Sequence, residues 1–129
     1  MAIANGACDR LVIGGTDRTR ECSGKLLNTI YRNGRVGFYF VTDTGAALTF
    51  TGLGDKQVKP DPDTAVQPID GVIFGYGGKT DRANAVGSCR FTNPYRKPGI
   101  VQCRADTSNG QFEASFRTDG NPPSVTNPR

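Results

Sequence analysis

The chain lacks histidine and tryptophan altogether, and its 129 residues include a single methionine and only two glutamates. Without histidine there can be no Ser-His or Cys-His relay, which disfavours the common forms of nucleophilic catalysis. Because glutamate and methionine are strong helix formers, their shortage disfavours long helices. No apolar run reaches the roughly 20 residues that a membrane-spanning helix needs. These absences favour a non-catalytic protein without a cofactor or a membrane span, and a hydrolase that uses carboxylates is the open alternative.

Glycine and proline are abundant, with 17 glycines and eight prolines. Both residues mark turns, so this composition suits short strands joined by tight connections. We expect residues 1–119 to form a single antiparallel all-β domain, a small β-barrel or β-sandwich of about eight short strands. Residues 120–129 are rich in proline, which cannot donate to a sheet, so we expect a flexible tail that does not join a ladder easily.

Four cysteines form two pairs of equal spacing, Cys8 with Cys22 and Cys89 with Cys103, and each pair encloses thirteen residues. An even count in a short chain is typical of an oxidising compartment. The chain has no Cys-x-x-Cys motif, which disfavours a zinc site, and free buried thiols are a further alternative. Of the three connectivities that four cysteines allow, we predict the two local disulfides. Each would close a loop of about 15 residues and stabilise the fold by about 3 kcal/mol.

The first seven residues contain an Ala-x-Ala pattern that resembles the end of a cleaved signal peptide. Together with the cysteines, this pattern predicts a periplasmic or secreted protein whose signal peptide has been removed. A cytoplasmic start with an ordinary leader of small residues is the alternative.

Asn33-Gly34 is the strongest hairpin signal in the chain, because a type I′ turn needs positive φ at both central residues. As a two-residue loop, it would place Tyr31 opposite Val36. Both faces of the resulting hairpin, residues 25–42, are then apolar, so the sheet must be covered on both sides or meet a partner. The sequence therefore leaves open a homodimer, or another protein interface, at this hairpin.

A second Asn-Gly step at 109–110 predicts a hairpin in which Cys103 lies opposite Phe116 on the core face. The same register would place Asp106 opposite Glu113 on the solvent face, an unfavourable pair. Further strands are expected at 11–13, 46–51, 71–76, 83–91 and 100–104, and a long polar loop at 52–68.

The formal net charge is +4, and eleven of the sixteen basic residues are arginine, whose planar guanidinium suits carboxylate and phosphate groups. We therefore expect the partner to be an anionic ligand or an acidic protein. The best candidate site is the loop between Cys89 and Cys103, because two prolines stiffen it and a preorganised loop loses less entropy on binding. Arginines at the tip of the first hairpin would extend this site. The predicted binding residues are Arg90, Tyr95, Arg96, Lys97, Arg32 and Arg35.

Two other functions would also use these basic residues. The braced loop would suit an inhibitor of a trypsin-type protease, with Arg96 entering the specificity pocket. Nucleic-acid binding needs aromatic and basic residues interleaved on one face, and the expected export from the cytoplasm disfavours it. No metal ligand and no catalytic residue is predicted.

Overall fold

The computed structural model of the protein describes residues 2–92, 99–119 and 124–125. Three of the predicted binding residues, Tyr95, Arg96 and Lys97, lie outside the described residues. Their role at the tip of the braced loop, and the protease-inhibitor alternative that rests on Arg96, therefore remain predictions.

The described chain is built almost wholly from strands, with two short 3-10 turns, η1 (Thr19–Glu21) and η2 (Gly54–Lys56). The strands are β1 (Ala2–Ile13), β2 (Thr16–Asp17), β3 (Cys22–Ile30), β4 (Arg35–Thr42), β5 (Ala47–Leu53), β6 (Val58–Asp61), β7 (Thr64–Tyr76), β8 (Lys79–Thr92), β9 (Ile100–Thr107), β10 (Gly110–Thr118) and β11 (Ser124–Val125). The short strands β2, β6 and β11 are additions at the ends of longer ones.

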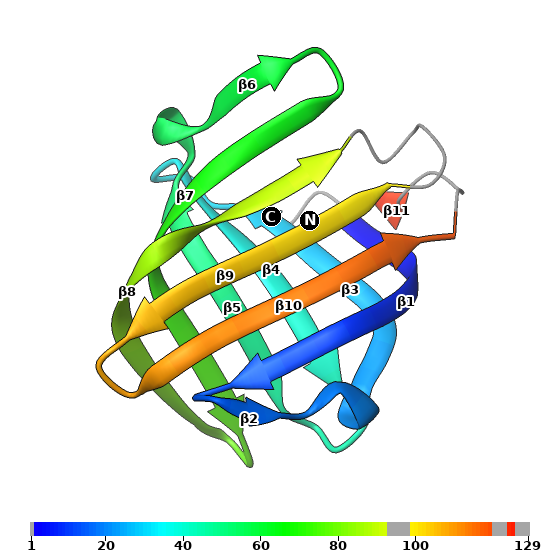
Figure 1. Cartoon of the computed structure of the whole chain (residues 1–129), viewed down its shortest axis with the longest axis vertical. Coiled ribbons are helices and arrows are strands. Elements are labelled where there is room, and N and C mark those ends of the chain that lie inside the picture. The colour runs from blue at the N-terminus through cyan, green and yellow to red at the C-terminus, as the bar shows by residue number, and fades with distance from the viewer. Residues whose placement is uncertain (1, 93–98, 120–123, 126–129) are drawn as a thin grey trace.

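Within the described residues, the other eight strands form a closed antiparallel barrel. Their order is β1, β3, β4, β5, β7, β8, β9 and β10, and β10 returns to pair with β1. Each barrel strand thus lies beside the next one in the chain, and Figure 1 shows β10, in orange, next to β1, in blue. Closure removes the two open edges that a sheet would otherwise expose. The all-β prediction is confirmed, and the fold is the barrel rather than the sandwich.

Large apolar side chains fill the middle of the barrel. Phe40, Phe50 and Phe116 are fully buried there, as are Leu11 and Leu48. The rings of Phe40 and Phe50 meet edge to face, with their centroids 5.8 Å apart. A barrel of about eight strands is just wide enough for side chains to fill it, so this part of the interior is a packed core.

Both predicted disulfides are present, Cys8–Cys22 and Cys89–Cys103. The first ties β1 to the start of β3, and its cysteines are partly buried. The second joins β8 and β9 at directly opposite positions. The side chains of Cys89 and Cys103 are 0% and 1% exposed, so this bridge lies inside the barrel wall, on the core face.

The β3–β4 hairpin differs by one residue from its expected register, because Ile30 rather than Tyr31 lies opposite Val36. Gly34 has a φ of 85°, but no described residue other than glycine has a positive φ. Asn33 therefore does not adopt the type I′ conformation. Instead, the N–H of Gly34 donates to the carbonyl of Tyr31 at 3.0 Å, which closes a longer loop that needs only one left-handed residue. This one-residue difference in register moves the Tyr31 side chain to the outer face of the barrel.

The β9–β10 hairpin differs from its expected register by two residues. Gly110, with a φ of 112°, lies opposite Thr107, so the loop is residues 108–109. A shift of two preserves the faces, because side chains alternate with a period of two. The prediction that Cys103 faces the core is confirmed, but its partner across the ladder is Ala114 rather than Phe116.

The prediction of a long loop at 52–68 is wrong. This segment contains the end of β5, η2, β6 and the first residues of β7, and β6 pairs with β7. Pro60 is compatible with β6 because that strand has a neighbour on one side only. At the other end of the chain, β11 pairs with Ala2 and Ile3, so part of the proline-rich segment does join a ladder.

Candidate functional site

The described members of the predicted binding set do not form one site. Arg90 lies on β8 and is exposed, whereas Arg32 lies in the β3–β4 turn. Arg35, at the start of β4, forms an ion pair with Asp70 of β7, and Arg82 lies 3.9 Å from the same carboxylate. Since β5 and β7 separate β4 from β8, the hairpin arginines do not extend a site centred on Arg90.

A different residue joins Arg90 on the outer face of the barrel. Cys89 and Cys103 lie directly opposite each other, so the residues that follow them, Arg90 and Arg104, both point outward on neighbouring strands. Arg90 pairs with Gln102, which lies two residues before Arg104 on β9, so the two arginines are diagonal neighbours across the ladder. Residues in this diagonal relation have Cα atoms about 7–8 Å apart, within reach of long side chains. We call Arg90 and Arg104 the arginine pair.

A shallow hollow of about 300 Å³ lies between the members of the arginine pair. Its other polar lining comes from β8, β9 and β10, namely Ser88, Gln102, Glu113 and Ser115. The hydroxyls and the amide can donate hydrogen bonds to a bound group in addition to the two guanidiniums.

A neighbouring side chain orients Arg104 without neutralising it. Glu113 lies opposite Arg104, not opposite Asp106 as expected, and it pairs with Arg10 at 2.8 Å. With its side-chain amide turned to satisfy its neighbours, Gln111 accepts from Nε of Arg104 at 2.8 Å. Among the described residues, no carboxylate forms an ion pair with either member of the arginine pair. The hollow therefore has an excess of positive charge.

A second acidic residue on this side of the barrel is also already paired. The Asp9 carboxylate accepts hydrogen bonds from the Arg117 guanidinium at 2.6 and 3.0 Å. This contact lowers the pKa of Asp9 and raises that of Arg117, as expected for a charge-assisted bidentate pair. Both side chains are exposed, so solvent screens the interaction strongly.

Arg104 and Gln102 are not among the predicted binding residues, although the sequence contains a signal for them. If two cysteines are bonded across neighbouring antiparallel strands and point inward, then the residues on either side of each cysteine point outward. That rule selects Ser88, Arg90, Gln102 and Arg104 from the sequence. The prediction instead assigned the ligand to the turn that the disulfide encloses.

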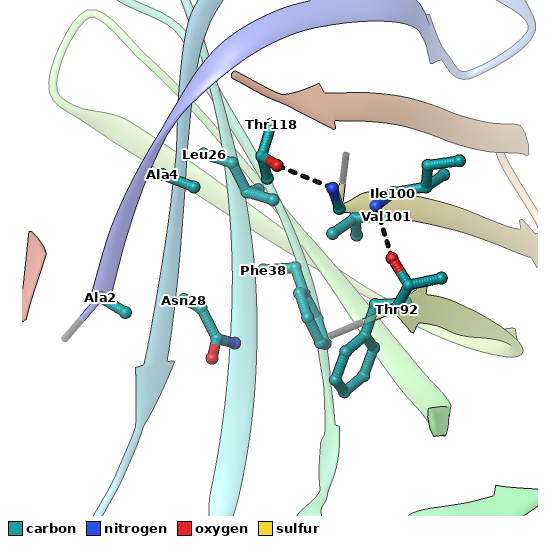
Figure 2. Close-up of a pocket in the computed structure, with 11 residues that line it drawn as sticks. Ala2, Ala4, Leu26, Asn28, Phe38, Thr92, Ile100, Val101 and Thr118 are labelled. Carbon is teal, nitrogen blue, oxygen red and sulfur yellow. Dashed lines mark hydrogen bonds between the residues drawn. The ribbon is translucent and has the colours of Figure 1, made fainter. Parts of the chain in front are cut away.

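A small cavity of about 110 Å³ opens at the end of the barrel where β1 begins and β10 ends. Figure 2 shows Ala2 and Ala4 of β1 on one side and Ile100 and Val101 of β9 on the other, with the Phe38 ring between them. We call this space the barrel-mouth cavity. The residues that line it are Ala2, Ala4, Leu26, Asn28, Phe38, Phe91, Thr92, Gly99, Ile100, Val101 and Thr118.

The outer face of the β3–β4 hairpin is partly covered by its own tyrosines. A Cβ atom on Gly37 would lie 2.9 Å from the Tyr39 ring and 3.6 Å from the Tyr31 ring, so both rings lie over this glycine. Thr49 is buried beside them, although it belongs to the outer face. The apolar surface that motivates a homodimer is therefore smaller than the sequence suggests. Ile30 is 71% exposed, but it lies on the core-facing side of β3, opposite the buried Val36. The dimer stays a prediction.

Comparisons with protein-family models, with curated proteins and with solved structures find no match. Across the described residues, no helix is long and apolar enough to cross a membrane. The described part of the chain also contains no group of three or more potential ligands that could hold a metal ion. The hollow at the arginine pair and the barrel-mouth cavity are therefore the basis for the functional proposals.

Proposed function

We propose that the protein is a secreted or periplasmic binding module without catalytic activity, and that it holds an anionic ligand on the arginine pair. The observation that carries this proposal is that Arg90 and Arg104 flank a polar hollow and have no carboxylate partner among the described residues. A carboxylate, sulfate or phosphate group between them would accept several charge-assisted hydrogen bonds, which are about twice as strong as neutral ones.

The disulfide beneath the arginine pair supports this role. Cys89–Cys103 fixes β8 against β9 at the residues next to both arginines. Because the backbones of the two strands cannot separate, the spacing of the two arginine Cα atoms is set before a ligand arrives. A preorganised site loses less conformational entropy on binding, and that saving increases affinity. The expectation of a disulfide-braced basic site is thus kept, but its centre moves from a turn to the face of the sheet.

The two disulfides also support the proposed location. Disulfides persist in secreted and periplasmic proteins, whereas cytosolic thiols are usually kept reduced. A binding module in such a compartment would meet anions such as the acidic groups of polysaccharides or the phosphates of surface polymers.

The test is a titration of the protein with inorganic sulfate and phosphate, followed through the arginine Nε signals in NMR spectra. The double variant Arg90→Ala/Arg104→Ala should bind at least tenfold more weakly, since losing two charged donors removes more than about 1.4 kcal/mol. The matched control is Arg20→Ala/Lys25→Ala, which removes the same charge from two exposed positions outside the predicted binding set. It should bind almost as the natural protein does.

The pattern across the two variants decides the outcome. An equal loss in both would mean that net charge, not the arginine pair, attracts the anion. No loss in the Arg90/Arg104 variant would overturn the proposal. The conservative variant Arg90→Lys/Arg104→Lys adds a further check, because it keeps the charge but removes the planar fork that binds in a bidentate manner. The affinity of this lysine variant for the anion should lie between that of Arg90→Ala/Arg104→Ala and that of the control variant.

A further inference from the structure

The barrel-mouth cavity is a blind cup. Its lining residues Phe38 and Val101 lie opposite Phe50 and Phe116 in the ladders, and both of these phenylalanines are fully buried. Its floor and walls include Leu26 and Phe38, which are themselves almost completely buried. Because Leu26, Phe38 and Val101 belong to the same buried cluster as these phenylalanines, the packed core closes the inner end of the cup.

The cup exists because β1 presents only small side chains to this layer. Ala2 and Ala4 line it from β1, and Gly99 lines it at the start of β9. The rings of Phe38 and Phe91 line it as well, and their centroids are 5.3 Å apart.

The polar atoms in the lining are mostly engaged elsewhere. The Thr118 hydroxyl accepts from the N–H of Gly99, and the Thr92 hydroxyl accepts from the N–H of Ile100, both at 2.8 Å (Figure 2). The side-chain amide of Asn28 donates to the carbonyl of Gly37 at 3.1 Å. Among the described residues that line the cup, none is ionisable. A charged or strongly polar molecule would find few partners there, and its desolvation would not be compensated.

We propose that the barrel-mouth cavity binds one small uncharged apolar molecule of about six carbon atoms. A volume of about 110 Å³ is of the same order as the apolar cavities of about 150 Å³ that stay dry and bind benzene in other proteins. The mouth of a β-barrel is a common place for such a ligand. This site is on the inside of the barrel, separate from the arginine pair on its outer face, and the two proposals stand independently.

Benzene is the probe, and the experiment is a titration followed by methyl and aromatic NMR signals. Bound benzene should give saturable shifts and cross-relaxation with Val101 and Phe38, which line the cup. The variant Ala4→Leu fills the cup and should weaken binding at least tenfold. The matched control is Ala7→Leu, the same change on the same strand at an exposed position. Its affinity should equal that of the natural protein.

A second variant, which enlarges the cup instead of filling it, keeps the test decisive if Ala4→Leu does not fold. Val101→Ala enlarges the cup by removing two methyl groups from its lining and should bind p-xylene more tightly than the natural protein does, by about tenfold. Non-saturable shifts, shifts at residues away from the cup, or equal affinity in Ala4→Leu and Ala7→Leu would each overturn the proposal. So would an unchanged affinity for p-xylene in Val101→Ala.

Discussion

The two disulfides close loops of equal length but differ in accessibility, and this difference predicts an order of reduction. Both bridges have a sequence separation of 14. Cys89 and Cys103 are fully buried, whereas Cys8 and Cys22 are only partly buried. Because a reducing thiolate must reach a sulfur atom, mild dithiothreitol should cleave Cys8–Cys22 in the folded protein. Cys89–Cys103 should be cleaved only when the barrel opens.

Removing each bridge by substitution should also have unequal effects on stability. In the chain-entropy model, a loop of about 15 residues contributes about 3 kcal/mol, which is the expected loss for Cys8→Ala/Cys22→Ala. Cys89→Ala/Cys103→Ala loses the same entropy and also leaves space in the core where two sulfur atoms were packed. Each small core cavity adds about 1 kcal/mol, so the loss should reach about 5 kcal/mol. That is a large share of the 5–15 kcal/mol that typical domains possess.

The assay traps free thiols with an alkylating agent at successive times during reduction, and peptide masses then report which bridge has opened. Unfolding by urea measures the free energy of the two double alanine variants. Equal rates of cleavage for the two bridges in the folded protein would refute the reasoning from burial. So would a smaller loss of stability in Cys89→Ala/Cys103→Ala than in Cys8→Ala/Cys22→Ala.

Two further predictions concern the backbone and the surface charges. A Cβ atom on Gly87 would lie 1.9 Å from the Arg104 carbonyl oxygen, so Gly87→Ala should lower the free energy of unfolding by about 1–3 kcal/mol. Gly75→Ala, whose Cβ would make an ordinary 3.4 Å contact, is the control and should lose much less. The pKa of Asp9 is lowered by Arg117, so this pair stabilises the fold above the ordinary aspartate pKa and the contribution disappears as the pH falls through the lowered value. Asp9→Asn should therefore flatten the acid side of the stability-pH profile, and an unchanged profile in urea unfolding would contradict this.

Composition and cysteine spacing predicted the fold class and both disulfides, but they did not predict strand lengths or registers. The hairpin at Asn33-Gly34 shows why. Asn-Gly is compatible with a two-residue turn and with a longer loop that needs a single left-handed glycine. The choice between them depends on which residues of β3 must face the core. Tyr31 and Ile30 are both apolar, so local pattern alone could not decide between them.

The predicted site was centred on the turn between Cys89 and Cys103, whereas the proposed site lies on the face of the sheet. Arg90 belongs to both, and it is exposed beside the disulfide. Arg35, in contrast, forms an ion pair with Asp70, and no local feature of the sequence joins residues 35 positions apart. Arg104 was overlooked because the predicted disulfide was treated as closing a turn, and not as joining two antiparallel strands whose flanking residues point outward.

The sequence by itself determined that the protein would be a disulfide-bonded all-β domain with an excess of arginine. Glycine, proline and cysteine content act locally, through backbone conformation and short loops, so these properties can be read along the chain. Only the tertiary structure decided that the sheet closes into a barrel and which registers its hairpins adopt. It also decided that two arginines meet on its surface, because these features depend on pairing between residues that are distant in the chain.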